Sequence, residues 1–524
     1  DRPTRRRAGN SEPTRAMIRP SHALQERALL SLIRVFDRTS WLAVLTAAFL
    51  VPVLHIPACL NPFEIPKIAT LGVLICVAYG LGLPVWLFEK RWRGQSFATS
   101  LPVLVLTLLA VLATVFSIHP QTSWQGSFAR QNGTRTLVLF VAWYFLVRFS
   151  LCHDEGRRSK MLLWAFVLAG VPMCLYGVLQ HFGLDLTTGF SFGERARPHG
   201  TLAYVNLLAG YLSFLLPLIG LLLLNSKRGK TRTMLCVLFV AAWYLLLATY
   251  CRGAWLAVLL FCATALLGLL FWIRRRVRWR RLAVVPALMV LGTLLFYGLP
   301  WLVPQSLQES ADMAGVTQRT PAQRLASSFD FGELTVASRL HMWRIALDIT
   351  AEYPWFGSGP ETFVFLVPTR RTLQHVEYFG RRGLVENAHN EILHLAANTG
   401  LLAVAAYLWM LIAHFLHVVK GVRMTSDSKR KTTLGALALI LIAYLTRSQV
   451  NVNSVENSLF FWTVLGLFAA YNVREQKPIV CSKVSSYGWK FGALAACPVT
   501  AIVLICVLIR PYQAGVLGHR AAKT

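Results

Sequence analysis

Long apolar runs recur along the whole chain, and this feature restricts the fold more than any other. Residues 233–250 and 253–273, for example, each have the length and apolarity that a helix needs to cross a bilayer. Inside a bilayer only α-helices and closed β-barrels satisfy all backbone hydrogen bonds, and barrel strands would give short, alternating segments instead of long runs. With 55% hydrophobic and only 15% charged residues, the sequence predicts an all-α, polytopic membrane protein.

The apolar runs also predict how the chain is divided. We expect twelve or thirteen transmembrane helices in two bundles, at residues 41–303 and 391–509, with one large loop at 304–390 between them. A basic tail (1–40) precedes the first bundle, and a short tail (510–524) follows the second. The candidate spans are 41–57, 68–88, 101–117, 134–150, 161–181, 200–224, 233–250, 253–273, 282–303, 391–419, 432–449, 458–472 and 491–509.

The net charge of +30 predicts the orientation of the chain in the membrane. Alternate loops carry 35 of the 53 lysines and arginines, for example the run Arg274–Arg278. Because basic loops stay on the cytoplasmic side, we expect the loop 304–390 and the tail 510–524 to be extracytoplasmic. Basic loops of this kind are attracted to anionic membrane lipid, and we expect no nucleic-acid partner.

Arg252 is the most informative charged residue of the sequence. It lies in Thr249–Gly253, which interrupts an apolar stretch from Met234 to Trp272 that is about twice as long as one span needs. The interruption predicts a tight outer hairpin. An arginine kept at this depth usually faces a negative group, and the alternative is a hairpin cap that snorkels to lipid phosphate.

The large loop contains one clear amphipathic helix, predicted over Val336–Glu352, in which Arg339, His341 and Arg344 lie between apolar residues. Gly357–Pro360 then predicts a turn. Its glycines do not follow a strand, so the turn is not interpreted as a nucleotide-binding loop.

Polar residues cluster at Val385–His394, where the loop meets the next apolar run. In one interpretation Asn387 caps a helix whose first turn contains Glu391, and spacing alone favours this cap. In the other, Glu386 and His389 lie three residues apart on one helical face, so that the carboxylate orients the imidazole toward the loop.

Two further features concern a charge at the membrane surface and metals. Lys67, at the start of the second span, is interpreted as a side chain that snorkels to the surface, with a phosphate contact as the alternative. The ten cysteines show no Cys-x-x-Cys pair, and the loops contain no Asp-x-Asp pair. We therefore expect no metal and no cofactor.

Several of these residues fall into ordered motifs, and together they resemble the O-antigen ligase and O-antigen polymerase family (Wzy-C type) of bacterial inner-membrane glycosyltransferases. The resemblance covers roughly residues 40–510, with departures at Cys251, Asn398 and Ala403. The motifs are Thr249-Tyr250-Cys251-Arg252-Gly253-Ala254-Trp255, then Ser338-Arg339-x-x-x-Trp343 with Pro354-x-x-Gly357-x-Gly359, and then Ala388-His389-Asn390-x-x-Leu393 with Gly400.

The resemblance implies a GT-C-like helical fold and an enzyme of the bacterial inner membrane. Such an enzyme transfers a glycan from a polyprenyl (undecaprenyl) diphosphate carrier to an acceptor hydroxyl at the outer face, as a ligase or a polymerase. The implied partners are a lipid-linked oligosaccharide donor, a glycan or lipid acceptor, and membrane lipid. Transfer to protein within the same family, and a transporter or permease outside it, are the alternatives.

The resemblance also assigns roles to particular residues. Guanidinium groups bind phosphate oxygens without a metal, so Arg252 and Arg339 are expected to bind the diphosphate, with Arg344 and Arg197 as further candidates. Removal of the acceptor proton needs a base of near-neutral pKa. His389 occupies the family position for that base, which reverses the preference for a simple helix cap, and Glu386 is the second catalytic candidate.

Overall fold

The computed structural model describes most of the chain. The described residues are 20–91, 97–151, 156–184, 197–227, 229–272, 283–299, 302, 321–327, 330, 334–380, 383–451 and 453–471. The predicted span 491–509, the tail 510–524 and residues 1–19 of the basic tail lie outside them.

The described residues form helices and no strand, as the apolar runs predict. Twelve of the thirteen predicted spans coincide with helices. The long helices that correspond to them are α1 (Pro20–Val53), α2 (Glu64–Glu89), α3 (Phe97–Val115), α5 (Thr134–Ser150), α6 (Arg157–His181), α7 (Val205–Asn225), α8 (Lys230–Ala248), α9 (Arg252–Trp272), α11 (Val284–Gly298), α18 (Leu401–Met424), α19 (Ser428–Ser448) and α20 (Val455–Ala470).

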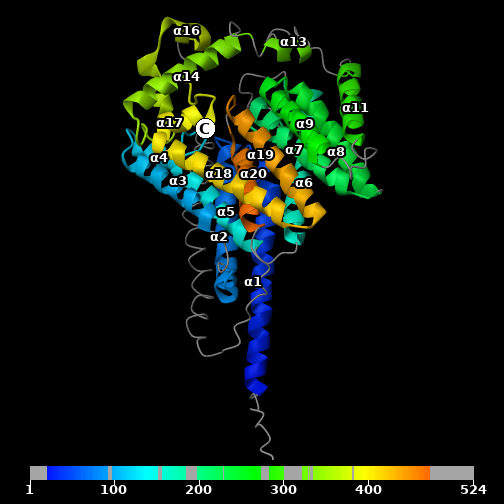
Figure 1. Ribbon diagram of the computed structural model, residues 1–524. Coiled ribbons are helices and arrows are strands. Elements are labelled where there is room, and N and C mark those ends of the chain that lie inside the picture. Colours follow the sequence, from blue (N-terminus) through cyan, green and yellow to red (C-terminus); the bar gives the residue numbers. More distant parts are fainter. Residues whose placement is uncertain are drawn as a thin grey trace, which may run out of the picture.

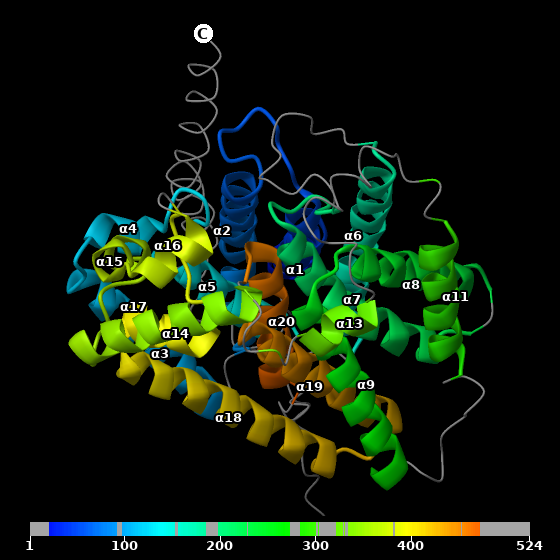
Figure 2. The ribbon, with the colours of Figure 1, turned by 90° about the horizontal axis from the view of Figure 1, so that it is seen from above.

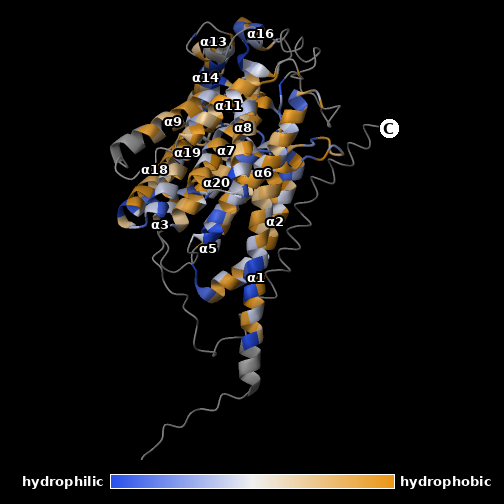
Figure 3. Ribbon diagram, turned by 90° about the vertical axis from the view of Figure 1, so that its right-hand side faces the viewer, coloured by the Kyte–Doolittle hydropathy of each residue, from blue (hydrophilic) through white to orange (hydrophobic). Residues whose placement is uncertain are grey.

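Among the described residues, six of these helices (α2, α3, α6, α7, α8 and α18) are long and apolar enough to cross a membrane by length and composition. The apolar parts of α9, α11 and α20 are somewhat shorter. Figure 3 shows that apolar residues dominate the bundle, whereas polar stretches gather around α16 and on the lower part of α1. The prediction of an all-α, multi-pass membrane protein is confirmed.

Shorter helices gather at one end of the bundle, at the top of Figure 1, which we call the loop end. Figure 2 looks down on this end and shows α14 crossing above α17. The helix predicted over Val336–Glu352 is present as α14, two residues longer at its start. The elements are α4 (Pro120–Gln125), α13 (Pro321–Ala326), α14 (Leu334–Glu352), α15 (Phe363–Leu366), the 3₁₀ turn η3 (Pro368–Arg370), α16 (Leu373–Phe379) and α17 (Glu391–Thr399).

α7 lies at the centre of the bundle. Almost its entire apolar length is buried, and it packs against α6, α8, α9, α19 and α20. The rings of Phe214 on α7 and Phe460 on α20 stack with their centroids 4.0 Å apart. Burial on all sides explains why the sequence of α7 is apolar around its whole circumference.

Lys67 is fully buried, so both sequence interpretations of this residue are wrong. Its Nζ donates to Oε2 of Glu456 at 3.2 Å and to the carbonyl of Thr201 at 3.2 Å, and neither charged side chain is exposed. The partner lies 389 residues away on α20, where local sequence gave no sign of it. Removal of either charge would leave the other buried and unpaired, so the pair ties α2 to α20.

Arg447, at the end of α19, is buried against α7. Its guanidinium donates to the backbone carbonyl of Asn206 at 2.9 Å and to Oδ1 of Asn453 at 3.1 Å. The group lies directly over Gly210, where a Cβ atom would overlap the guanidinium carbon. Asn453 in turn donates to Oε2 of Glu391 at 3.0 Å, so this contact leads from α7 to the first turn of α17.

Candidate active site at the loop end

The predicted span 391–419 is two helices and not one. α17 ends at Thr399 and α18 begins at Leu401, with Gly400 between them at φ +88°, a conformation that glycine adopts readily. A Cβ at Gly400 would overlap the carbonyl group of Trp355. The nine residues of α17 therefore belong to the loop end and not to the span.

α17 is held by α14 and by a small apolar core of its own. Met342, Ile345 and Ile349 on the buried face of α14 pack against Phe363 and Ala388, apart from the main core of the bundle. This second core fixes the polar segment 385–390 on the loop end, because apolar contacts lie on both sides of it.

The turn Pro354–Gly359 fixes the other end of α17. The N–H groups of Ser358 and Gly359 donate to the carbonyls of Ala397 and Asn398, at 3.0 and 2.8 Å. The N–H of Leu401 donates to the carbonyl of Pro354 at 2.8 Å. These bonds satisfy carbonyl groups that a helix end leaves unpaired, so the second family motif is a clamp on α17.

Gly357 in this turn is expected to tolerate no side chain. Its φ is +66°, and a Cβ would overlap the backbone of Asn398. We expect Gly357→Ala to lower the free energy of unfolding of the detergent-solubilised protein by well over the ~1–2 kcal/mol of backbone strain alone. The thermal unfolding midpoint should fall accordingly. Gly380→Ala is the matched control, because Gly380 has a similar φ of +74° but no atom of the described residues lies within 4 Å of its Cβ position. Equal shifts for the two variants would contradict the clamp.

His389 lies in the segment between the second core and α17. Its backbone N–H donates to Oδ1 of Asn387 at 2.6 Å, and its φ is +54°, which is unusual for a residue other than glycine. Nδ1 of the ring is buried and has no hydrogen-bond partner among the described residues. Burial, together with the nearby cations Arg339 and Arg130, lowers the pKa of His389 to about 4. The imidazole is therefore neutral at physiological pH.

The helix cap and the carboxylate partner both differ from the sequence interpretations. Asn390, not Asn387, caps α17, and its Oδ1 accepts from the N–H of Leu393 at 3.0 Å. Glu386 and His389 do not share a helical face, because residues 383–390 form no helix. Oε2 of Glu386 accepts instead from Oγ of Ser127, in the loop before α5, at 3.2 Å.

The four predicted arginines fall into two groups at the loop end. Arg339, partly buried on α14, is close enough to His389 to lower the pKa of that histidine, whereas Arg344 on the same helix is exposed. Arg252 begins α9 and donates to Oγ of Ser327 at 2.7 Å. Arg197 donates to the carbonyl of Thr249 at 3.3 Å, and therefore lies at the same α8–α9 hairpin as Arg252.

Arg130 is a further cation that the motifs did not single out. It lies in the loop between α4 and α5, which is pinched closed where Gly126 and Gly133 meet, since a Cβ on either would overlap the other. Arg130 lowers the pKa of both His389 and Glu361. Its Nη1 is buried without a hydrogen-bond partner in the described part of the chain. A lone arginine between two glycines was the available signal, but it has no local partner in the sequence.

A cavity of about 190 Å³ lies beside the His389 segment, with α3, α5, α17, α18, α19 and α20 around it. None of the six predicted site residues lines it, although Asn387 and Glu391 do. Its wall at the loop end is polar, and its deeper wall is apolar and aromatic. The polar residues include Arg130, Asn132, Glu361, Glu391, His394, Asn398 and Asn453, and the deeper ones include Leu106, Phe140, Tyr407, Tyr444, Phe461 and Trp462.

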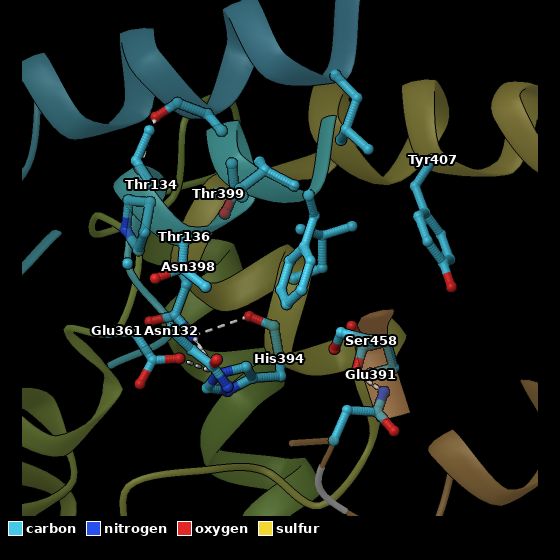
Figure 4. Close-up of a pocket in the computed structure, with 18 of the residues that line it drawn as sticks. Asn132, Thr134, Thr136, Glu361, Glu391, His394, Asn398, Thr399, Tyr407 and Ser458 are labelled. Atoms are coloured by element: carbon cyan, nitrogen blue, oxygen red, sulfur yellow. Dashed lines mark hydrogen bonds and ion pairs between the residues drawn. The ribbon is translucent and has the colours of Figure 1, made fainter. Parts of the chain in front are cut away.

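The polar wall is organised around His394 (Figure 4). Oε1 of Glu361 lies 3.6 Å from Nε2 of His394, and Asn398 Nδ2 lies 3.0 Å from Nδ1 of the same ring. Burial alone raises the pKa of Glu361, but Arg130 and His394 outweigh it and hold the pKa below its usual range. Glu361 therefore stays ionised at neutral pH.

Fold and site together define a class of protein: a multi-pass helical membrane protein with a buried, neutral histidine among arginines at one end of its bundle. Residues 237–408 match the model of the O-antigen ligase family (Wzy_C), which confirms over this range the resemblance seen in the motifs. The matched range includes Arg252, Arg339 and His389.

A curated relative agrees with this assignment. Over 353 residues the chain is 23% identical to the teichuronic acid biosynthesis protein TuaE of Bacillus subtilis (strain 168), and the similar region covers 65% of this chain and 67% of that protein. The family match and the relative support a glycosyltransferase-like enzyme with a role in cell-envelope polysaccharide biosynthesis.

Proposed function

We propose that this protein transfers a glycan from a polyprenyl diphosphate, of the undecaprenyl type, to an acceptor hydroxyl at the outer face of the bacterial inner membrane. It acts as an O-antigen ligase or polymerase, and without a metal ion. The observation that carries the proposal is the buried His389, a neutral imidazole with a ring nitrogen that has no partner among the described residues, and Arg339 lies close enough to lower its pKa. Its strained backbone, at φ +54°, is typical of a functional position.

The arginines fit a diphosphate leaving group. During transfer the carbon–oxygen bond between the sugar and the diphosphate breaks, and the carrier leaves with the electron pair. The growing negative charge is stabilised by cations placed beforehand, here Arg339 and Arg252, with Arg344 and Arg197 as further candidates. Planar guanidinium groups bind two phosphate oxygens at once, which an ammonium does not.

His389 completes the reaction. The acceptor oxygen bonds to the anomeric carbon of the donor sugar, and its proton passes to the neutral imidazole. In the free protein, burial and the arginines lower the pKa of His389. The negative charge of the departing diphosphate stabilises the protonated ring and so raises this pKa during the reaction. Glu386, bonded to Ser127, holds the segment before His389 against the α4–α5 loop.

The full chain in lipid nanodiscs, with a synthetic polyprenyl diphosphate-linked sugar as donor, tests this function. We expect the sugar to move to an alkyl glycoside acceptor, with release of polyprenyl diphosphate and with no loss of rate in EDTA. In intact cells, Asp330→Cys is expected to react with a membrane-impermeant thiol reagent, because the loop end faces outward. Labelling from the cytoplasmic side only would overturn the topology, and transport of the donor without transfer would indicate a permease.

A further inference from the structure

The cavity beside His389 has the wrong charge for a phosphate. Two carboxylates, Glu361 and Glu391, face it, and among the described residues Arg130 is the one arginine or lysine in its wall. Figure 4 shows Glu361 with His394 on one side of the space and Glu391 with Ser458 on the other. An anionic ligand would be repelled by the ionised carboxylate of Glu361.

One of these carboxylates has an unused oxygen. The Glu361 side chain is only 6% exposed, and its Oε1 faces His394. Its Oε2 is buried and has no hydrogen-bond partner in the parts of the chain that the structure describes. A buried acceptor of this kind is costly unless a donor is supplied, and an ionised carboxylate accepts strongly.

The remaining walls suit a ring that carries hydroxyl groups. Asn132 and Asn398 offer amides at the polar end. Tyr407, drawn in Figure 4, extends toward the space from α18, and Trp462 and Phe461 line the deeper wall with aromatic surface. A few polar groups over an apolar base are the usual composition of a small-molecule site, and aromatic rings cover the C–H face of a ligand.

The position of the cavity relates it to the proposed base. Asn387 and Glu391, two residues to either side of His389, both line it. Arg130 acts electrostatically on His389 and on Glu361 alike. A hydroxyl of a ligand seated in the cavity therefore lies next to the His389 segment, whereas the diphosphate is expected at the arginines on α9 and α14.

From these observations we propose that the cavity is the subsite for the terminal sugar of the acceptor, and that it selects an uncharged or amino sugar over an acidic one. That the bound sugar belongs to an acceptor rests on the proposed function, but binding of the sugar can be tested without turnover. Glu361 is the specificity-determining residue. It accepts a hydroxyl or ammonium hydrogen, and it repels a carboxylate.

Binding of three probes to the full chain in nanodiscs, measured by saturation-transfer NMR, tests the proposal. The probes are methyl glucoside, methyl glucosaminide and methyl glucuronide. We expect the first two to bind at least about tenfold more tightly than the glucuronide, corresponding to one repulsive charge contact. Equal affinities for all three, or binding of none, would overturn the subsite.

Glu361→Gln separates recognition from simple damage. The shape is kept and the charge is lost, so the glucoside is expected to bind about tenfold more weakly while the glucuronide binds more tightly. A gain for the acidic probe does not arise from misfolding. Glu377→Gln, at an exposed carboxylate on α16, is the matched control and should change neither affinity. Tyr407→Phe, which removes only a hydroxyl, should weaken the glucoside. Unchanged affinities in Glu361→Gln would refute the role of this residue.

Binding of polyprenyl diphosphate to the same preparations distinguishes this inference from the function on which it rests. If the glycosides bind as expected and the diphosphate does not, the transferase proposal fails and the sugar site stands. If the diphosphate binds and the glycosides do not, only the subsite is wrong.

Discussion

Replacement of His389 by asparagine is expected to slow glycan transfer by about 10²–10⁴-fold, because the acceptor hydroxyl loses its base while the donor keeps its cations. Asparagine is the appropriate change, since His389 has a φ of +54°, which asparagine adopts more readily than alanine. Single-turnover rates with donor already bound report the chemical step, and donor affinity is measured separately.

His119 provides the matched control for this variant. It is an exposed histidine at the loop end, stacked on Phe365, and it has no place in the proposed reaction. His119→Asn should retain turnover. Near-normal single-turnover rates in His389→Asn would mean that His389 is not the base, and the segment 386–391 would then serve only to position α17.

The pH dependence of transfer follows from the same residue. Neutral imidazole is the working form, and the pKa of His389 in the folded protein is about 4, below its ordinary value of 6.5. We therefore expect the rate to hold its plateau from neutral pH down to about pH 5 and to fall as the pH approaches 4. An inflection near pH 6.5 in the free enzyme would contradict the buried, neutral base.

The free energy of unfolding should also depend on the protonation of His389. Between pH 6.5 and about 4 the unfolded chain binds a proton at His389 and the folded chain does not. The contribution of this group to the free energy of unfolding therefore falls as the pH decreases through that window, and it does not change above pH 6.5.

Arg339→Ala and Arg252→Ala are each expected to abolish most of the transfer while the protein still inserts into the membrane. Each variant loses charge-assisted hydrogen bonds to the diphosphate worth ~1.5–3 kcal/mol, or about 10–150-fold in rate. Lysine at either position should also be poor, because an ammonium cannot bind two phosphate oxygens in one plane. Transfer assays on purified variants, normalised to the amount of folded protein, measure the effect.

A control at the opposite end of the bundle separates this effect from general loss of charge. Arg423→Ala removes an exposed arginine from the last turn of α18 and should leave transfer unchanged. Full activity in both Arg339→Ala and Arg252→Ala would remove the diphosphate-binding role. Arg344→Ala is expected to have a smaller effect than Arg339→Ala, because Arg344 is exposed on α14.

The fold could be predicted from the sequence to the extent that each element is encoded locally. The apolar length of a span and the helical periodicity of α14 are local properties, and both elements appear in the structure as helices. The boundary at Gly400 was missed because Ile392–Val419 is apolar enough to span a bilayer, and only the turn at Pro354–Gly359, packed against α17, shows why the helix ends there.

The candidate site was harder to predict from the sequence, because it is assembled from distant segments. His389, Arg252 and Arg339 were found through motifs, and their roles remain predictions. Arg130 and Glu361 lie more than 200 residues apart. They interact only because the α4–α5 loop meets the segment before α15 in the fold. The burial of Lys67 likewise depends on Glu456, on the last described helix. Long-range pairing of this kind leaves no periodic trace in the sequence.

The contact between Arg447 and Gly210 has a consequence for the comparison of related chains. Because the guanidinium occupies the place of a Cβ, any larger residue at 210 would displace Arg447 from the carbonyl of Asn206 and from Asn453. Conversely, a chain without arginine at 447 has no steric reason to keep glycine at 210. The two positions, 237 residues apart in sequence, should therefore change together in related chains. In a relative in which only one of them has changed, the helices that correspond to α7 and α19 are expected to cross at a different distance.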